Sequence, residues 1–354
     1  MVSFTYVDTK EGLLEAAAEW RNSEELAIDL ECENNLHHYG SYITLIQISD
    51  LHKNWIVDVL KLKEIAPLID TLENSSIQKI FHDVSFDFRI LHEQFASRPR
   101  NIFDTQIAAL LLGKEHLGLG DLLKEYLGIE KERKYQMADW TKRPLDTQML
   151  SYAVNDTLYL IQLRDLLKKE LQEKKRLLWA EEEFTAVENA GLTYKEQTFL
   201  DVRGSRELTP EQLGSLKRLF LLRQQMAKKV NRPVHFILNN NRLKEYALHP
   251  PHWEKVRGVH PIVRQEHQLF SKAVEEGKEE IVNIPIKEKK RSTTEQKALF
   301  EKLNETQQKI AQKAGIKGHL IINKEQMAEV IFAGNKNCLR KWQQKLLEEE
   351  GFKL

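Results

Sequence analysis

A nine-residue stretch from Glu25 to Glu33 constrains the fold of this chain more than any other. Apolar side chains stand at every second position from Leu26 to Leu30, a period of two that predicts a β-strand. Alternate side chains of a strand point to opposite faces, so Asp29 and Glu31 share one face. Adjacent carboxylates on a core strand repel each other and are costly to desolvate, which makes a hard divalent cation their natural partner. The alternative is an edge strand with a hydrated acidic face.

The composition indicates a globular protein that does not enter a membrane. Its 354 residues predict two or three domains, and 41% of them are hydrophobic and 30% charged. No apolar run approaches the roughly 18 residues of a membrane span, and the N-terminus carries no signal-peptide pattern. Cys32 and Cys338 form neither a disulfide framework nor a zinc motif, so we expect a cytoplasmic protein.

The formal net charge of zero conceals two halves of opposite charge. Residues 1–160 contain 16 Lys and Arg against 26 Asp and Glu, whereas residues 161–354 contain 37 against 27. An acidic half joined to a basic half is typical of a metal-dependent enzyme with an appendage that binds a polyanion. Chance segregation of solvated surface charge is the alternative.

The first half alternates strands and helices in a way that predicts an α/β fold. Three strands with short connections predict an antiparallel meander, and the helix-strand alternation that follows extends it into one mixed sheet. The expected strands are a short lead-in at 2–6, then 26–33, 42–49, 54–59, 77–82 and 101–103. The expected helices are 9–20, 60–72, 85–95, one from 105 onward, and 146–173.

Further carboxylates follow the strand expected at 77–82. Asp87 lies in the first turn of the next helix, where ligand sites of open α/β sheets gather, although its charge also complements the helix dipole. Asp83 is a competing candidate, and His82 is more simply explained as a structural residue. Asp104 precedes the helix from residue 105 and is expected to be its N-cap.

An Asp-x-Glu strand, an Asp after a later strand and a Tyr-x3-Asp pair together resemble the DEDDy 3′–5′ exonucleases. Tyr152 and Asp156 lie one turn apart on the helix expected at 146–173, where an ordinary surface pair would be the alternative. The flanking sequence is similar to ribonuclease D over roughly residues 1–170. The matching segments are 27–31, 45–48, 81–87, 103–106, 140–145 and 152–156.

The resemblance implies a ribonuclease H-like fold with a mixed five-stranded sheet in the order 3-2-1-4-5, whose second strand is antiparallel. It also implies that two divalent ions, Mg²⁺ or Mn²⁺, are bound by four carboxylates and that a tyrosine orients the attacking water. Two such ions about 4 Å apart neutralise the phosphodiester, generate hydroxide and stabilise the leaving 3′ oxygen. Oxygen ligands without a His or Cys cluster suit these ions rather than zinc, and no organic cofactor is expected. The implied ligands are Asp29, Glu31, Asp87 and Asp156, and the implied tyrosine is Tyr152.

The resemblance thus favours Asp87 over Asp83, but the chain departs from the family pattern at one position. Ribonuclease D usually carries a Lys seven residues before the Trp of its Asp-Trp pair, which is Trp140 here. This chain has Arg133 at that place, followed by Lys134. If that side chain contacts substrate phosphate, Arg substitutes for Lys with a different geometry.

The basic half is expected to begin with a helical module at 209–278. Thr209 and Pro210 form a strong helix start, and residues 211–244 carry a net charge of +7. The module resembles the helicase and ribonuclease D C-terminal (HRDC) module, a small bundle that binds nucleic acid. The pattern that carries this match is Arg223…Ala227…Pro233…Phe236…Leu243. The residues expected to contact nucleic acid are Arg133, Lys134, Arg223, Lys228, Lys229, Arg232 and Arg242.

A second copy of the module is expected at 294–354. A gapless shift of 84 residues aligns Leu219 with Leu303 and Asn239 with Asn323, although coincidental alignment of amphipathic helices is the alternative. The second copy lacks most of the basic positions, so we expect it to pack rather than to bind. With a basic linker at 287–291, the expected domains are 1–190, 209–278 and 294–354.

Together these features predict a cytoplasmic, monomeric exoribonuclease that removes nucleotides from RNA 3′ ends as 5′-mononucleotides. The resemblance implies tRNA precursors as substrates. One alternative is a DNA 3′–5′ exonuclease, because the same carboxylates serve both sugars. Another is a non-catalytic nucleic-acid-binding protein on an inactive scaffold, against which the presence of all four carboxylates argues.

Overall fold

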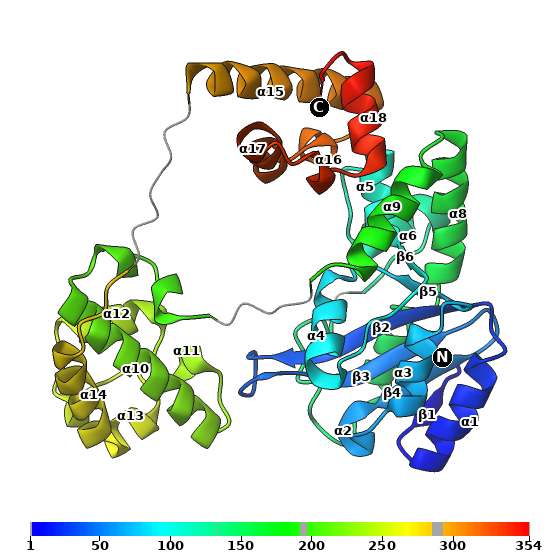
Figure 1. Ribbon diagram of the computed structural model, residues 1–354. Helices are drawn as coiled ribbons and strands as arrows, with labels where there is room; N and C mark the ends of the chain where they lie inside the picture. The colour runs from blue at the N-terminus through cyan, green and yellow to red at the C-terminus, as the bar shows by residue number, and fades with distance from the viewer. Residues whose placement is uncertain (1, 133, 192–196, 285–292, 354) are drawn as a thin grey trace. The chain divides into compact units, whose positions relative to one another are not determined.

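The computed structural model describes residues 2–353 apart from residue 133 and the segments 192–196 and 285–292 (Figure 1). The chain divides into two compact units. The first contains residues 1–31, 43–192 and 290–354, and the second contains residues 32–42 and 193–289. Across the described residues, no helix combines the length and apolar character needed to cross a membrane.

A six-stranded mixed sheet lies at the centre of the first unit, in the order β1-β4-β3-β2-β5-β6. The run β4-β3-β2-β5-β6 confirms the predicted order 3-2-1-4-5, and the lead-in strand adds a sixth member that pairs parallel with β4. β3 and β4 are antiparallel, whereas β5 pairs parallel with both β2 and β6. The strands are β1 (Thr5–Val7), β2 (Glu25–Asn34), β3 (Ser41–Ser49), β4 (Asn54–Asp58), β5 (Gln78–Phe81) and β6 (Ile102–Asp104).

Helices cover this sheet. α1 packs on α3 and presents Trp20 edge-on to Trp55 of β4 at a ring distance of 6.0 Å, while α5 and α6 pack on α8. The helices that precede the first helical module are α1 (Lys10–Trp20), α2 (Val59–Leu62), α3 (Ala66–Glu73), α4 (Ser85–Phe95), α5 (Thr105–Leu112), α6 (Leu119–Leu127), α7 (Thr147–Val154), α8 (Leu160–Glu173) and α9 (Leu177–Glu188).

Two of the helices predicted as continuous are divided. The one expected at 60–72 is α2 followed by α3, because Lys63 adopts a left-handed φ of 61° and Pro67 lies in the first turn of α3. The one expected at 146–173 is α7 followed by α8. Between them the backbone N–H groups of residues 155–157 bond to carbonyls three residues back, which tightens the chain and ends α7.

The second unit is a helical bundle built on α10. Thr209 forms a capping box at its start, as the Thr-Pro signal predicted. α10 packs closely against α14, since a Cβ on Gly277 would lie only 2.4 Å from the Cα of Ser215. The helices are α10 (Pro210–Lys229), α11 (Val234–Ile237), α12 (Asn240–Leu248), α13 (Pro261–Gln265) and α14 (His267–Glu279).

The C-terminal helices repeat this bundle within the first unit. α15, α16 and α17 each begin 84 residues after α10, α11 and α12, which agrees with the predicted internal repeat. Trp342 stacks on Trp179 of α9 at a ring distance of 4.8 Å and donates a 3.0 Å hydrogen bond from Nε1 to Glu183. The segment therefore packs on the sheet-containing part, while the predicted linker 287–291 lies outside the described residues. These helices are α15 (Thr294–Ala314), α16 (Gly318–Ile321), α17 (Lys324–Ala333) and α18 (Lys341–Glu349).

Candidate active site

Strand β2 carries Asp29 and Glu31 past the end of its neighbour. The parallel pairing of β2 with β5 ends at Ala27 and Ile80, whereas β2 continues to Asn34. Both carboxylates therefore lie at the carboxyl end of the parallel strands, the edge at which open α/β sheets bind ligands. They are partly buried among core residues, so their charges are poorly solvated.

Asp87 approaches the same edge from the first turn of α4. It is 8% exposed, and its charge adds to the effects of burial, Asp29 and Asp156 that raise the pKa of Glu31. Asp83 is exposed instead, at a left-handed φ of 61°, which supports the choice of Asp87. His82 has a structural role, because its Nδ1 shares a 2.9 Å hydrogen bond with Thr105 and burial lowers its pKa to about 4.

The turn that leads into α4 is held by Asp104. As predicted, this carboxylate caps α5, where Oδ1 accepts from the backbone N–H groups of Gln106 at 2.7 Å and Ile107 at 3.1 Å. It also accepts from the N–H groups of Asp83 at 3.3 Å, on Oδ1, and Val84 at 2.9 Å, on Oδ2. One buried carboxylate thus joins the end of β6 to the turn that positions Asp87.

Tyr152 and Asp156 complete the site from the end of α7. Tyr152 packs in a core cluster with Trp140, and its ring lies 5.6 Å from that of Tyr135. Asp156 is 6% exposed and belongs to the tightened turn after α7, which Thr157 fixes through a 2.6 Å hydroxyl contact with Ser49. The predicted pair is therefore brought together, although it spans a helix end rather than one continuous helix.

The carboxylates form one cluster. Oxygens of Asp29, Glu31 and Asp156 lie within 4.8 Å of one another. Burial and the neighbouring Asp156 raise the pKa of Asp29 to about 8, and burial with Asp29 and Asp156 raises the pKa of Glu31 well above its usual range. Burial and Asp29 likewise raise the pKa of Asp87. A divalent cation would relieve this repulsion, and a site of carboxylate oxygens suits Mg²⁺ or Mn²⁺.

Lys131 reaches this cluster, which the sequence did not predict. Its ammonium forms an ion pair with Asp156 and lies 5.4 Å from the centre of the Tyr152 ring. Lys131 stands in the segment between α6 and α7, where neither helical nor strand periodicity indicates the direction of a side chain. The signal in the sequence that could have drawn attention to Lys131 was its closeness to two other basic residues, Arg133 and Lys134.

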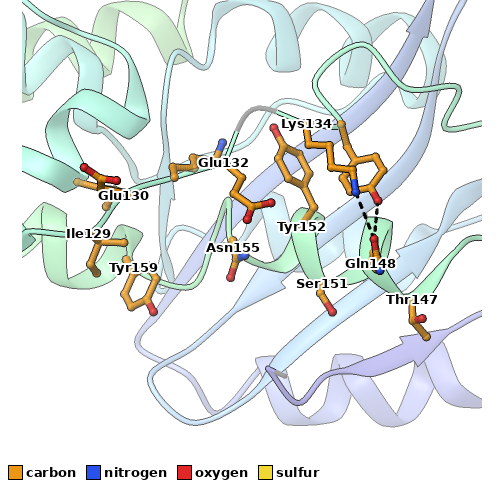
Figure 2. Close-up of a pocket in the computed structure, with 13 residues that line it drawn as sticks. Ile129, Glu130, Glu132, Lys134, Thr147, Gln148, Ser151, Tyr152, Asn155 and Tyr159 are labelled. Carbon is orange, nitrogen blue, oxygen red and sulfur yellow. Dashed lines mark hydrogen bonds between the residues drawn. The ribbon is translucent and has the colours of Figure 1, made fainter.

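A pocket of about 520 Å³ opens beside Tyr152 (Figure 2). Tyr152, Ser151 and Gln148 of α7 line it on one side, and residues 129–132, 134 and 135 also line it. Gln148 Oε1 accepts hydrogen bonds from Lys134 at 3.3 Å and from the Tyr135 hydroxyl at 3.1 Å. The pocket offers polar and aromatic side chains next to the acidic cluster.

The residues expected to contact nucleic acid differ in how accessible the structure leaves them. Arg133 lies outside the described residues, and Lys134 lines the pocket. The prediction that Arg223 contacts nucleic acid is wrong. Arg223 is 2% exposed and donates from Nη1 to the Leu238 carbonyl at 3.1 Å and to Asn240 at 2.7 Å. It therefore stabilises the bundle interior and is not available to phosphate.

The other four basic residues lie at or near the surface of the second unit. Lys228 and Arg232 are exposed, and Lys229 is exposed but forms a 2.6 Å ion pair with Glu266. Arg242 is partly buried and donates to the carbonyls of residues 257 and 258.

The chain is similar to known proteins both in sequence and in fold. A family model described as 3′–5′ exonuclease matches residues 4–172. Ribonuclease D of Sphingobium indicum is 31% identical over 258 residues, which are 70% of this chain and 66% of that protein. Exosome complex component 10 of Mus musculus is 30% identical over 76% of this chain, but the match covers only 32% of the mouse protein. The chain thus spans about two thirds of the first relative and a third of the second.

The fold has a solved counterpart over almost its whole length. The crystal structure of Escherichia coli RNase D, an exoribonuclease involved in structured RNA processing, matches with a TM-score of 0.73. The match covers 98% of this chain and 99% of that one at 21% identity, so it bears on the fold alone.

Proposed function

This chain belongs to the ribonuclease D family of 3′–5′ exoribonucleases, and from that premise we propose that it shortens RNA 3′ ends by two-metal-ion hydrolysis. One observation carries the proposal, namely the convergence of three carboxylates within 4.8 Å, with Asp87 beside them. When bound, Mg²⁺ or Mn²⁺ ions supply the hydroxide and neutralise the phosphate. The proposed ligands are Asp29, Glu31, Asp87 and Asp156.

Tyr152 is proposed to orient the attacking water. Burial and the charges of Asp156, Glu31 and Asp29 raise the pKa of its hydroxyl above the usual value, so the phenol keeps its proton at neutral pH. A protonated phenol donates a hydrogen bond and does not act as a base. Its part is therefore to position the water.

The substrate is proposed to be structured RNA, with tRNA precursors as the expected class and 5′-mononucleotides as the product. The ribonuclease names of the curated relatives support RNA as the polymer. We further propose that the protein is a monomer and acts in the cytoplasm.

The first helical module at 209–278 is proposed to be an HRDC module that binds the body of the RNA. Lys228, Lys229, Arg232 and Arg242 are the residues proposed to contact phosphate there. Lys134, which lines the pocket beside Tyr152, and Arg133 are also proposed to contact phosphate. Residues 1–160 are acidic, so a basic surface elsewhere would offset the repulsion of RNA. Phosphate contacts release counterions, which makes the resulting affinity depend on salt.

The test is hydrolysis of 3′-labelled RNA and DNA oligonucleotides of one sequence, side by side, with and without Mn²⁺. We expect Mn²⁺-dependent release of labelled mononucleotides from RNA and the loss of that release in Asp87→Asn. Preferential cleavage of DNA would identify a DNA exonuclease instead. Absence of metal-dependent cleavage of either polymer, by a protein that binds RNA, would identify a non-catalytic binding protein.

The module is tested by charge removal in the full chain. Replacing Lys228 and Arg232 with Gln should weaken the binding of a tRNA-sized RNA and make the slope of log affinity against log salt shallower. The loss should appear mainly in KM, because such contacts bind the ground and transition states alike. A short oligonucleotide serves as the control substrate and should be hydrolysed at the normal rate.

A further inference from the structure

The ammonium group of Lys131 occupies the position of a counter-ion in the acidic cluster. It is paired with Asp156, and its charge also acts on Asp29 and Glu31. Asp156 is thus in contact with an ammonium group that this chain itself supplies. The family pattern places its basic residue at position 133, so Lys131 is not the residue that the resemblance led us to expect.

The rest of the side chain is held in place. The Cβ of Lys131 lies 3.4 Å from the point at which a side chain on Gly120 would begin, so its stem passes close to α6. Its head lies over the face of Tyr152, where a cation is attracted to the ring. Only 18% of the Lys131 side chain is exposed, so most of it is covered by the protein.

We propose that Lys131 is a built-in competitor for the metal site, whose ammonium must leave Asp156 before a divalent ion can bind that carboxylate. This inference rests on the proposed function, because it assumes that Asp156 is a metal ligand. An ammonium and a divalent ion cannot both contact the same carboxylate at full strength, since their positive charges repel each other at that distance. Only molecules in which the ion pair is open can bind a metal ion through Asp156. The apparent metal affinity is therefore the intrinsic affinity multiplied by the fraction of molecules in which the ion pair is open.

The displaced ammonium has space to occupy. Lys131 lines the pocket beside Tyr152, together with the acidic residues Glu130 and Glu132. Movement of the head into this pocket would free Asp156 without movement of the backbone. The consequence is a site in which Asp156 is already paired in the metal-free protein, so that a higher concentration of metal is needed to fill it.

The test measures Mn²⁺ binding to the full-length, metal-free protein by titration calorimetry, without RNA. Lys131→Met keeps the stem over Gly120 and removes the charge, and we expect it to bind Mn²⁺ at least about tenfold more tightly than the wild type. Lys131→Arg keeps the cation and should retain the weak affinity. Lys134→Met removes a charge from the same segment, where Lys134 bonds to Gln148, and should change the affinity less than about twofold.

The outcomes separate this inference from the proposed function. Unchanged or weaker Mn²⁺ binding by Lys131→Met would overturn the inference alone, and weaker binding would show that Lys131 positions Asp156 as a ligand. An equal gain in Lys134→Met would also overturn it, because the effect would then be one of general charge. Failure of every variant and of the wild type to bind Mn²⁺ would overturn both the inference and the proposed function.

Discussion

Replacing Asp104 with Asn tests how the turn before α4 is held. The Oδ1 atom of Asp104 accepts from residues 83, 106 and 107, whereas Oδ2 accepts from the Val84 N–H at 2.9 Å. Asn can keep the first oxygen, and with it the cap of α5, but presents an NH₂ group to the Val84 donor. The substitution therefore removes the 2.9 Å bond from Val84, the shorter of the two links to the turn, and keeps both the helix cap and the 3.3 Å bond from Asp83.

The expected cost follows from burial. Asp104 is 1% exposed, so the Val84 N–H is left without a partner and without water, which costs about 1–3 kcal/mol. For a unit of this size, about 2 kcal/mol lowers the melting temperature by about 4–8 °C. Because Asp87 follows Val84 by three residues, we also expect kcat to fall about tenfold.

The assay is thermal unfolding in the presence of EDTA, followed by kcat with Mn²⁺ on a short RNA. Asp146→Asn is the matched control, because Asp146 caps α7 through a single exposed bond to the Gln148 N–H at 2.7 Å. Asn is as good an N-cap as Asp, so this control should stay within about 0.5 kcal/mol of the wild type. If Asp104→Asn behaved like Asp146→Asn, the hydrogen bond from Val84 to Asp104 would contribute nothing measurable to the free energy of unfolding.

Three further predictions concern the site and the core. Tyr152→Phe should slow hydrolysis by about 10²-fold, with Mn²⁺ affinity unchanged in calorimetry; equal loss of affinity would make the residue structural. The pKa of Asp29 is raised to about 8, so the metal-free folded protein keeps a proton on this carboxyl group that the unfolded chain loses near pH 4. Mn²⁺ must displace this proton in order to bind Asp29. The rise in melting temperature caused by Mn²⁺ should therefore grow from pH 6 to pH 8, and a rise independent of pH would contradict this. Burial lowers the pKa of Lys79 from 10.5 to about 8, so the folded state binds fewer protons between these values and stability increases with pH across them. In urea unfolding measured as a function of pH, Lys79→Met should remove this increase, which amounts to about 2–3 kcal/mol in the free energy of unfolding. An unchanged dependence on pH in the variant would show that Lys79 is not its source.

The strands and the Asp29–Glu31 pair were predictable because local pattern determines them, whereas the strand order and the choice of Asp87 over Asp83 were implied by the family resemblance. β2 is a strand of alternating apolar residues, and its two acids must share a face whatever the rest of the chain does. The capping roles of Thr209 and Asp104 were equally local, since each depends on backbone N–H groups within three residues.

The features that the sequence did not predict depend on contacts between distant residues. The burial of Arg223 requires the Leu238 carbonyl as an acceptor, which no periodicity in α10 reveals. Lys131 meets Asp156 only because the segment after α6 folds back over α7. The break after α7 depends on Thr157 meeting Ser49 of β3, a contact across 108 positions.

The stacking of Trp342 on Trp179 has a consequence for the synthesis of the protein. The two residues are 163 positions apart, so α9 leaves the ribosome long before the helix that covers it. At about 5–20 residues per second, Trp179 remains without its partner for about 10–30 s. During this interval the nascent chain exposes an aromatic surface that the finished protein conceals, and any stop codon between the two residues would make that exposure permanent.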